Sequence, residues 1–126
     1  MPKLLTSHTY RGLGGESMNL IPPHGPLNAK IALIGEAPGE NEDLRGEPFV
    51  GRSGSLLRQW WDKAGVVAEE VYKDNVVPYR PKDNNIWSVP RGEVQAKWIP
   101  QLLERLSRLT DVRVIVPTGN LACSAL

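Results

Sequence analysis

Four carboxylates follow a short apolar segment, and their chemistry suits the hydrolysis of a glycosidic bond. Residues 30–35 form an apolar run that ends in a glycine, and Glu36, Glu40, Glu42 and Asp43 come soon after it. A carboxylate can accept a proton from water, orient that water, or stabilise positive charge that develops on a sugar ring. Such acids are usually solvated surface residues, but the glycines and prolines around them favour one fixed loop conformation. We therefore treat this loop as a candidate site.

The same loop contains Phe49, the single phenylalanine of the chain, between Pro48 and Val50. Core packing is one role for such a ring, and stacking on a nucleobase, worth about 1–3 kcal/mol per base, is another. Gly51 and Gly54 open the next helix, where backbone N–H groups could hold a phosphate. The loop has neither the Gly-Lys-Ser/Thr of a P-loop nor a Gly-x-Gly-x-x-Gly turn, so neither of these nucleotide sites is indicated.

Alternating strands and helices must position this loop. Apolar or β-branched runs predict three buried strands, over residues 30–35, 71–77 and 112–116. Amphipathic patterns predict three helices, over residues 54–64, 92–109 and 119–126. This order implies a three-layer α/β/α fold with a short parallel sheet. Ligands of such folds bind beyond the carboxyl ends of the strands, where the predicted loops meet, over residues 35–53, 78–90 and 117–120.

Length and composition fit one domain. The 126 residues are 40% hydrophobic, and the glycines and prolines of residues 1–29 predict an irregular N-terminal arm before a domain over residues 30–126. The net charge of +1 gives no overall attraction to nucleic acid, so binding DNA would require a local basic patch. We see no signal peptide and no run of roughly 20 apolar residues for a membrane span, so we expect no membrane partner and a cytoplasmic protein.

The loop sequence resembles the first motif of uracil-DNA glycosylases of the iron–sulfur type (family four) and of the glycosylase-like domain of phage-type DNA polymerases. It reads GEAPGENEDLRGEPFVGRSGSLL over residues 35–57. Residues 74–85 resemble the Asn-Val-Val-x-Cys-Arg-Pro-Pro-x-Asn of that family, and residues 98–102 resemble its Cys-x-Pro-x-Leu. The resemblance spans residues 30–126, and it implies a uracil-DNA glycosylase-like α/β domain.

The resemblance implies roles for the matching residues. Glu36 would position the attacking water or the uracil, Glu42 would support it, and Phe49 would stack on the base. Asn75 would read the base edge, since an amide can pair with both O4 and N3–H of uracil and pairs poorly with cytosine. The other substrate-binding residues implied are Ala37, Pro38, Gly39 and Asn84, with Asn85 as the alternative to Asn84. Without the motif, Glu36 would be a solvated acid and Asn75 a residue that caps a turn.

The family's iron–sulfur cluster is not supported by this sequence. A [4Fe–4S] cluster needs four cysteine thiolates, and two of the family's cysteine positions correspond here to Tyr79 and Trp98. The single cysteine, Cys123, also excludes a disulfide within the chain. We therefore expect no metal and no cofactor. The burial of aromatic side chains can replace the stabilisation that a bound metal cluster gives to a fold. We therefore expect the two rings to pack against each other.

A later family motif, a His-Pro-Ser-like loop that enters the DNA minor groove, does not occur before Leu126. His8 and His24 lie in the arm and do not match it; we expect both to be exposed. We therefore expect a C-terminally shortened domain. Flipping a base out of a duplex costs a few kcal/mol, so we expect any activity to favour single-stranded DNA.

These observations favour an enzyme that hydrolyses the N-glycosidic bond of deoxyuridine in single-stranded or other uracil-containing DNA, in base excision repair. The alternative is a catalytically weak or inactive module that binds DNA or a replication or repair protein; a phage source, and hence the host cytoplasm, would suit such a module. A third interpretation is a fragment whose remaining strand and His loop lie beyond Leu126. Exposed apolar residues at Leu121 and Leu126 would indicate a missing piece or a partner.

Overall fold

Three parallel strands form the central sheet of a computed structural model that describes residues 9–12 and 15–126. The strands are β3 (Ile31–Gly35), β4 (Tyr72–Asn75) and β5 (Val114–Pro117), and their order in the sheet is β4–β3–β5. Gly35 lies opposite Asn75, and Ile34 lies opposite Pro117. The carboxyl ends of all three strands therefore lie at the same edge of the sheet, as the sequence predicts.

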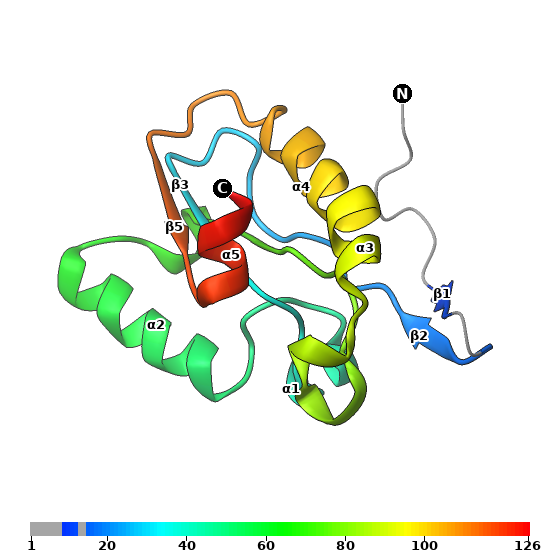
Figure 1. Ribbon diagram of the computed structural model, residues 1–126. Helices are drawn as coiled ribbons and strands as arrows, with labels where there is room; N and C mark the ends of the chain where they lie inside the picture. The colour runs from blue at the N-terminus through cyan, green and yellow to red at the C-terminus, as the bar shows by residue number, and fades with distance from the viewer. Residues whose placement is uncertain (1–8, 13–14) are drawn as a thin grey trace.

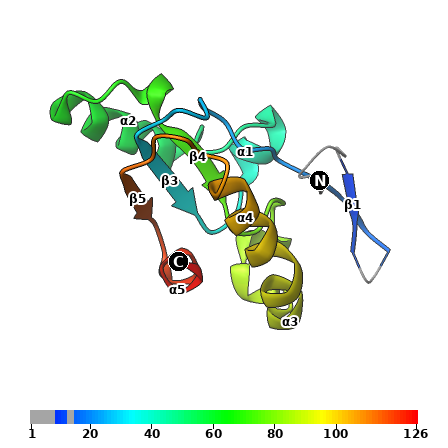
Figure 2. The ribbon, with the colours of Figure 1, turned by 90° about the horizontal axis from the view of Figure 1, so that it is seen from above.

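Helices cover both faces of this sheet (Figures 1 and 2). α1 (Glu40–Arg45) and α2 (Arg52–Ala64) lie on one side, and α4 (Ile99–Leu106) and α5 (Asn120–Ala125) lie on the other. The predicted three-layer α/β fold is confirmed. α1 was not predicted, because it is a single short helix between Gly39 and Gly46 in a segment expected to be a loop.

The helix predicted over residues 92–109 is divided into three parts. α3 (Arg91–Glu93) leads into a π-helical turn, η4 (Val94–Trp98), and α4 follows with Pro100 in its first turn. Proline has no N–H and its ring crowds the preceding turn, which a regular α-helix does not accommodate. The wider turn directly before Pro100 absorbs this conflict without breaking the helical direction.

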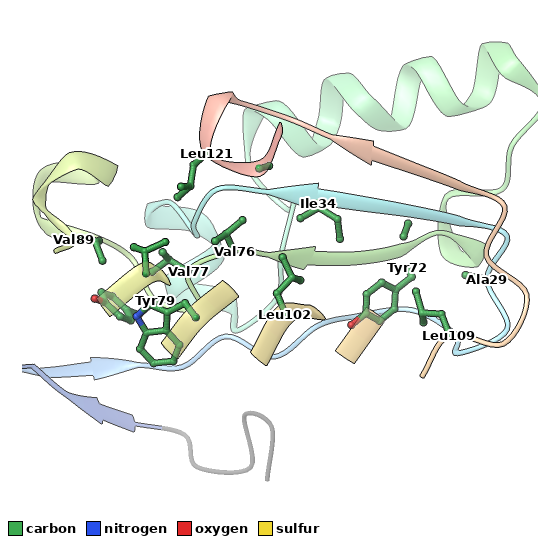
Figure 3. Close-up of a cluster of buried hydrophobic side chains, with 14 residues drawn as sticks. Ala29, Ile34, Tyr72, Val76, Val77, Tyr79, Val89, Leu102, Leu109 and Leu121 are labelled. Carbon is green, nitrogen blue, oxygen red and sulfur yellow. The ribbon is translucent and has the colours of Figure 1, made fainter. Parts of the chain in front are cut away.

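The core lies between the sheet and the helix that contains η4 and α4. Ile34 of β3, Val76 after β4 and Leu102 of α4 are completely buried, and their side chains converge there (Figure 3). Each such side chain contributes about 1.5–3 kcal/mol through the hydrophobic effect. This packing fixes the ends of the strands, and it thereby fixes the loops that follow them.

The N-terminal segment is more regular than predicted. β1 (Thr9–Arg11) and β2 (Ser17–Asn19) form an antiparallel hairpin, so the expectation of a wholly irregular arm was wrong. Sequence patterns missed it because each strand has only three residues and few apolar side chains. Beyond it, the chain pairs with the outer edge of β4, where the His24 and Lys73 backbones exchange hydrogen bonds of 2.9 and 2.7 Å. The boundary of the domain at residue 30 stays a prediction.

His8 lies outside the described residues, whereas His24 is exposed as expected. Among the residues that the structure describes, no helix has the length and apolar character that crossing a membrane would require.

Candidate active site

A cleft of about 620 Å³ opens where the three strands end. It contains every residue predicted for the site except Pro38: Glu36, Ala37, Gly39, Glu42, Phe49, Asn75 and Asn84. Pro38 is buried and is not among the residues that line the cleft. Six further lining residues, to which the sequence analysis assigned no site role, come from α2 and from the end of β5: Arg52, Leu56, Leu57, Trp60, Thr118 and Gly119. The cleft therefore extends beyond the predicted site along α2.

Phe49 and Asn75 approach each other over Gly35. A Cβ atom on Gly35 would lie 2.7 Å from Phe49 Cζ and 2.5 Å from Asn75 Oδ1, so only glycine leaves room for both groups. Phe49 has a backbone φ of 56°, which is uncommon for a bulky residue and is held by the surrounding structure. The ring and the amide thus form one wall of the cleft, and no sequence pattern indicates that Gly35 makes this possible.

Gly35→Ala tests this close approach. The added methyl group must displace the ring, the amide or both, and overpacking of this kind costs about 1–3 kcal/mol. We expect the free energy of unfolding, measured by chemical denaturation, to fall by about that amount. Gly92→Ala is the matched control, because a Cβ at Gly92 meets nothing within 4 Å. Equal losses for the two variants would contradict the role of Gly35.

Glu36 is held at the start of α5 by one of its two carboxylate oxygens. Oε2 accepts a hydrogen bond of 2.9 Å from the Leu121 N–H. A Cβ at Gly119 would lie 2.5 Å from the Glu36 Cδ, so the absence of a side chain there lets the carboxylate reach α5. None of the described residues donates a hydrogen bond to Oε1, so this oxygen can accept one from a water molecule in the cleft.

Unlike Glu36, Glu42 uses its carboxylate to hold the loop between β3 and α2 in shape. Its carboxylate accepts hydrogen bonds from the backbone N–H groups of Gly39, Val50 and Gly51, at 3.0, 2.9 and 2.7 Å. These bonds join the start of α1 to the residues directly before α2. Because both carboxylate oxygens are occupied in this way, the geometry favours a structural role for Glu42 over direct contact with the attacking water.

A buried ion pair fixes the end of β4. Asp74 accepts hydrogen bonds from Arg105 Nε at 2.7 Å and from the Tyr72 hydroxyl at 2.8 Å. Asp74 and Arg105 are 3% and 5% exposed. Burial and the neighbouring Asp74 carboxylate raise the pKa of Tyr72, so this hydroxyl stays a donor. Asp74 also accepts from the Asn75 N–H at 2.8 Å, so the pair sets the backbone of the residue predicted to read the base.

Of the two adjacent candidates Asn84 and Asn85, Asn84 is the one that lines the cleft. It lies at the end of η2 (Lys82–Asn84), and its Oδ1 accepts a hydrogen bond of 2.7 Å from Arg80 Nε. Asn85 instead caps the next turn, accepting from the Trp87 N–H at 3.1 Å. Of the two candidates, Asn84 therefore lines the cleft, and its role toward the substrate stays a prediction.

The residues at the family's metal positions do not fit an iron–sulfur cluster. Tyr79 and Trp98 are buried and pack edge to face with ring centroids 5.7 Å apart, which confirms the expected contact. Cys123 is exposed on α5. Within residues 9–12 and 15–126, no group of three or more His, Cys, Asp or Glu side chains could hold a metal ion. The donors that such a cluster needs are not present at this position.

Comparison with known proteins agrees with the fold. Residues 22–126 match the model of the uracil DNA glycosylase superfamily. A type-4 uracil-DNA glycosylase of Thermotoga maritima is 40% identical over 84% of this chain and 53% of its own length. One from Archaeoglobus fulgidus is 47% identical over 82% and 50%, respectively, so the chain spans about half the length of the curated relatives it matches. From the extent of the family match, the chain belongs to the uracil DNA glycosylase superfamily.

Proposed function

We propose that this protein hydrolyses the N-glycosidic bond of deoxyuridine in DNA and releases uracil, as in base excision repair, and that it acts in the cytoplasm. One observation carries the proposal: Glu36, Phe49 and Asn75 meet in one cleft at the carboxyl ends of the strands. The relatives named above, about half of whose length this chain spans, are called uracil-DNA glycosylases, which supports the same assignment.

Each of these three residues has a distinct task in the proposed reaction. The uracil ring stacks on Phe49, while the amide of Asn75 pairs with O4 and N3–H. Glu36 orients a water molecule through Oε1 toward the sugar carbon and accepts a proton from it as the bond breaks. Its negative charge also stabilises the cation-like sugar of the transition state. The backbone bonds of Glu42 keep the loop in the shape that these steps need.

Asn75→Asp tests how the base is recognised. A carboxylate has no donor for O4 of uracil, and an unpaired polar group in the complex costs about 1–3 kcal/mol. We expect kcat/KM for uracil release to fall by about 10- to 100-fold. The measurement is steady-state kinetics on an oligonucleotide with one uracil. Unchanged kcat/KM would contradict the assignment of Asn75.

The decisive experiment is a glycosylase assay on a labelled single-stranded oligonucleotide with one uracil, followed by alkali. Strand breakage at the uracil position that requires Glu36 supports the proposed function. A duplex with a U·G pair is the second substrate, and we expect it to react more slowly. Equal or faster cleavage of the duplex would contradict the single-strand preference, and absence of cleavage on both substrates would overturn the proposal.

A second candidate, a module that binds a replication or repair protein, is favoured by the apolar edge of the sheet. Val114 and Ile115 of β5 are 52% and 41% exposed, and Leu126 is 46% exposed, whereas Leu121 is buried. Exposed apolar residues on an outer strand are typical of sites where another chain binds. If uracil release fails, replacing Val114 with lysine and measuring the size of complexes formed with candidate repair proteins tests this alternative.

A further inference from the structure

We propose that an aromatic cluster centred on Glu93 takes the structural place of the family's metal cluster, and that Glu93 thereby positions Asn84 in the cleft. The aromatic cluster consists of Tyr10, Tyr79 and Trp98. The positioning half of this inference rests on the proposed glycosylase function; the structural half does not.

Glu93 connects three separate segments of the chain. Its Oε1 accepts a hydrogen bond of 3.1 Å from the hydroxyl of Tyr10, in β1. Its Oε2 accepts one of 2.7 Å from the hydroxyl of Tyr79, after β4, and one of 2.8 Å from Nε1 of Trp98, in η4. A single carboxylate therefore joins the hairpin, the loop after β4 and the helix, which is the kind of cross-link that a metal ion supplies in other small domains.

The three rings also contact one another directly. Tyr10 stacks on Tyr79 with a centroid distance of 5.4 Å, and Trp98 lies edge to face against both, at 5.0 and 5.7 Å. Tyr79 and Trp98 are 5% and 2% exposed. Lys97 Nζ lies 4.3 Å from the centroid of the Tyr10 ring. The cluster is thus a packed structure with favourable ring geometry.

The protonation states agree with this arrangement. Burial raises the pKa of Glu93, but hydrogen bonds from Trp98, Tyr79 and Tyr10 outweigh burial, and the pKa lies below its usual value. Burial, and to a smaller extent the hydrogen bond to Glu93, raise the pKa values of Tyr10 and Tyr79. At neutral pH the carboxylate is therefore an acceptor, and both hydroxyls are donors.

The cluster reaches the cleft through Arg80. Tyr79 is held by Glu93, and the next residue, Arg80, donates the 2.7 Å hydrogen bond to Asn84 Oδ1. The backbone of Asn84 has a φ of 56°, and its N–H donates to the Pro81 carbonyl at 3.0 Å. A strained loop tip of this kind keeps its shape only where the surrounding structure holds it. Loss of the hydrogen bond between Tyr79 and Glu93 should therefore make Asn84, which lines the cleft, more mobile.

The structural half is tested with Glu93→Ala, with Glu104→Ala as the control on the same helical segment. Glu104 pairs with Arg108 near the surface, at 3.3 Å. We expect Glu93→Ala to lower the Tm by about 5–10 °C and to speed hydrogen exchange of the Asn84 amide, with Glu104→Ala near the wild type in both. We also expect protein from iron-supplemented cells to contain no stoichiometric iron. Stoichiometric iron, or an unchanged Tm and exchange rate, would overturn the structural role.

The positioning half is tested by a double-mutant cycle with Asn84→Ala, at a temperature where all variants are folded. We expect Glu93→Ala to lower kcat for uracil release by about 10-fold in the wild-type background and to have little further effect on Asn84→Ala. Glu93→Gln, which retains one acceptor oxygen, should restore part of kcat. Additive effects would overturn the positioning role. If the wild-type protein releases no uracil, the proposed function fails, while the Tm and exchange results still decide the structural half.

Discussion

We expect Glu36→Gln to lower the proposed rate of uracil release by about 100- to 10,000-fold, the usual contribution of a positioned acid or base, and to leave the fold intact. The glutamine carbonyl can still accept the hydrogen bond from the Leu121 N–H that Glu36 Oε2 accepts now. It cannot take a proton from water, and it does not carry the negative charge that stabilises a cation-like sugar. The measurement is a single-turnover assay with enzyme in excess over the uracil-containing strand.

Glu47→Gln is the matched control for charge. Glu47 is exposed, belongs to the same loop and does not line the cleft, so its loss should leave the rate within a few fold of the wild type. A comparable loss in both variants would mean that the net charge of the loop matters and that Glu36 has no specific role. A Glu36→Gln variant as fast as the wild type would remove the proposed mechanism altogether.

We expect Arg105→Ala to lower the free energy of unfolding by about 3–5 kcal/mol, because it leaves the Asp74 carboxylate buried without its partner. The wild-type pair has an Nε–Oδ2 distance of 2.7 Å and is almost completely buried. Chemical denaturation monitored by tryptophan fluorescence measures the loss. Since Asp74 also accepts from the Asn75 N–H, we expect kcat/KM to fall as well, even at temperatures where the variant is folded.

Arg108→Ala provides the comparison for Arg105→Ala. Arg108 follows the same helix and pairs with Glu104 near the surface. Exposed pairs of this type contribute about 0.2–1 kcal/mol. If both arginine variants lost the same stability, the buried pair would have no special importance, and the end of β4 would be held by packing alone.

The sequence predicted the parallel sheet, and most of the predicted site residues lie in one cleft, because both depend on local patterns. The apolar run that became β3 and the motif around Phe49 can be recognised without knowing what they contact. The predicted contact between Tyr79 and Trp98 also formed, since both occupy positions marked by the motif.

Other contacts between distant segments were not predicted. Asp74 and Arg105 are 31 residues apart, and nothing near either one indicates that they pair. Glu93 looks like an ordinary helix-start acid until the fold brings Tyr10 to it across 83 residues. The role of Gly35 was missed for the same reason, since the close approach of Phe49 and Asn75 exists only in three dimensions.

The two edges of the central sheet differ, and this limits how copies of the protein can associate. The chain itself covers the edge of β4, through the hydrogen bonds between His24 and Lys73, whereas no described residue pairs with the outer edge of β5. Two copies that joined edge to edge through β5 would leave no free edge in the shared sheet. Association by this route would end at a closed dimer, and it could not propagate into a fibre.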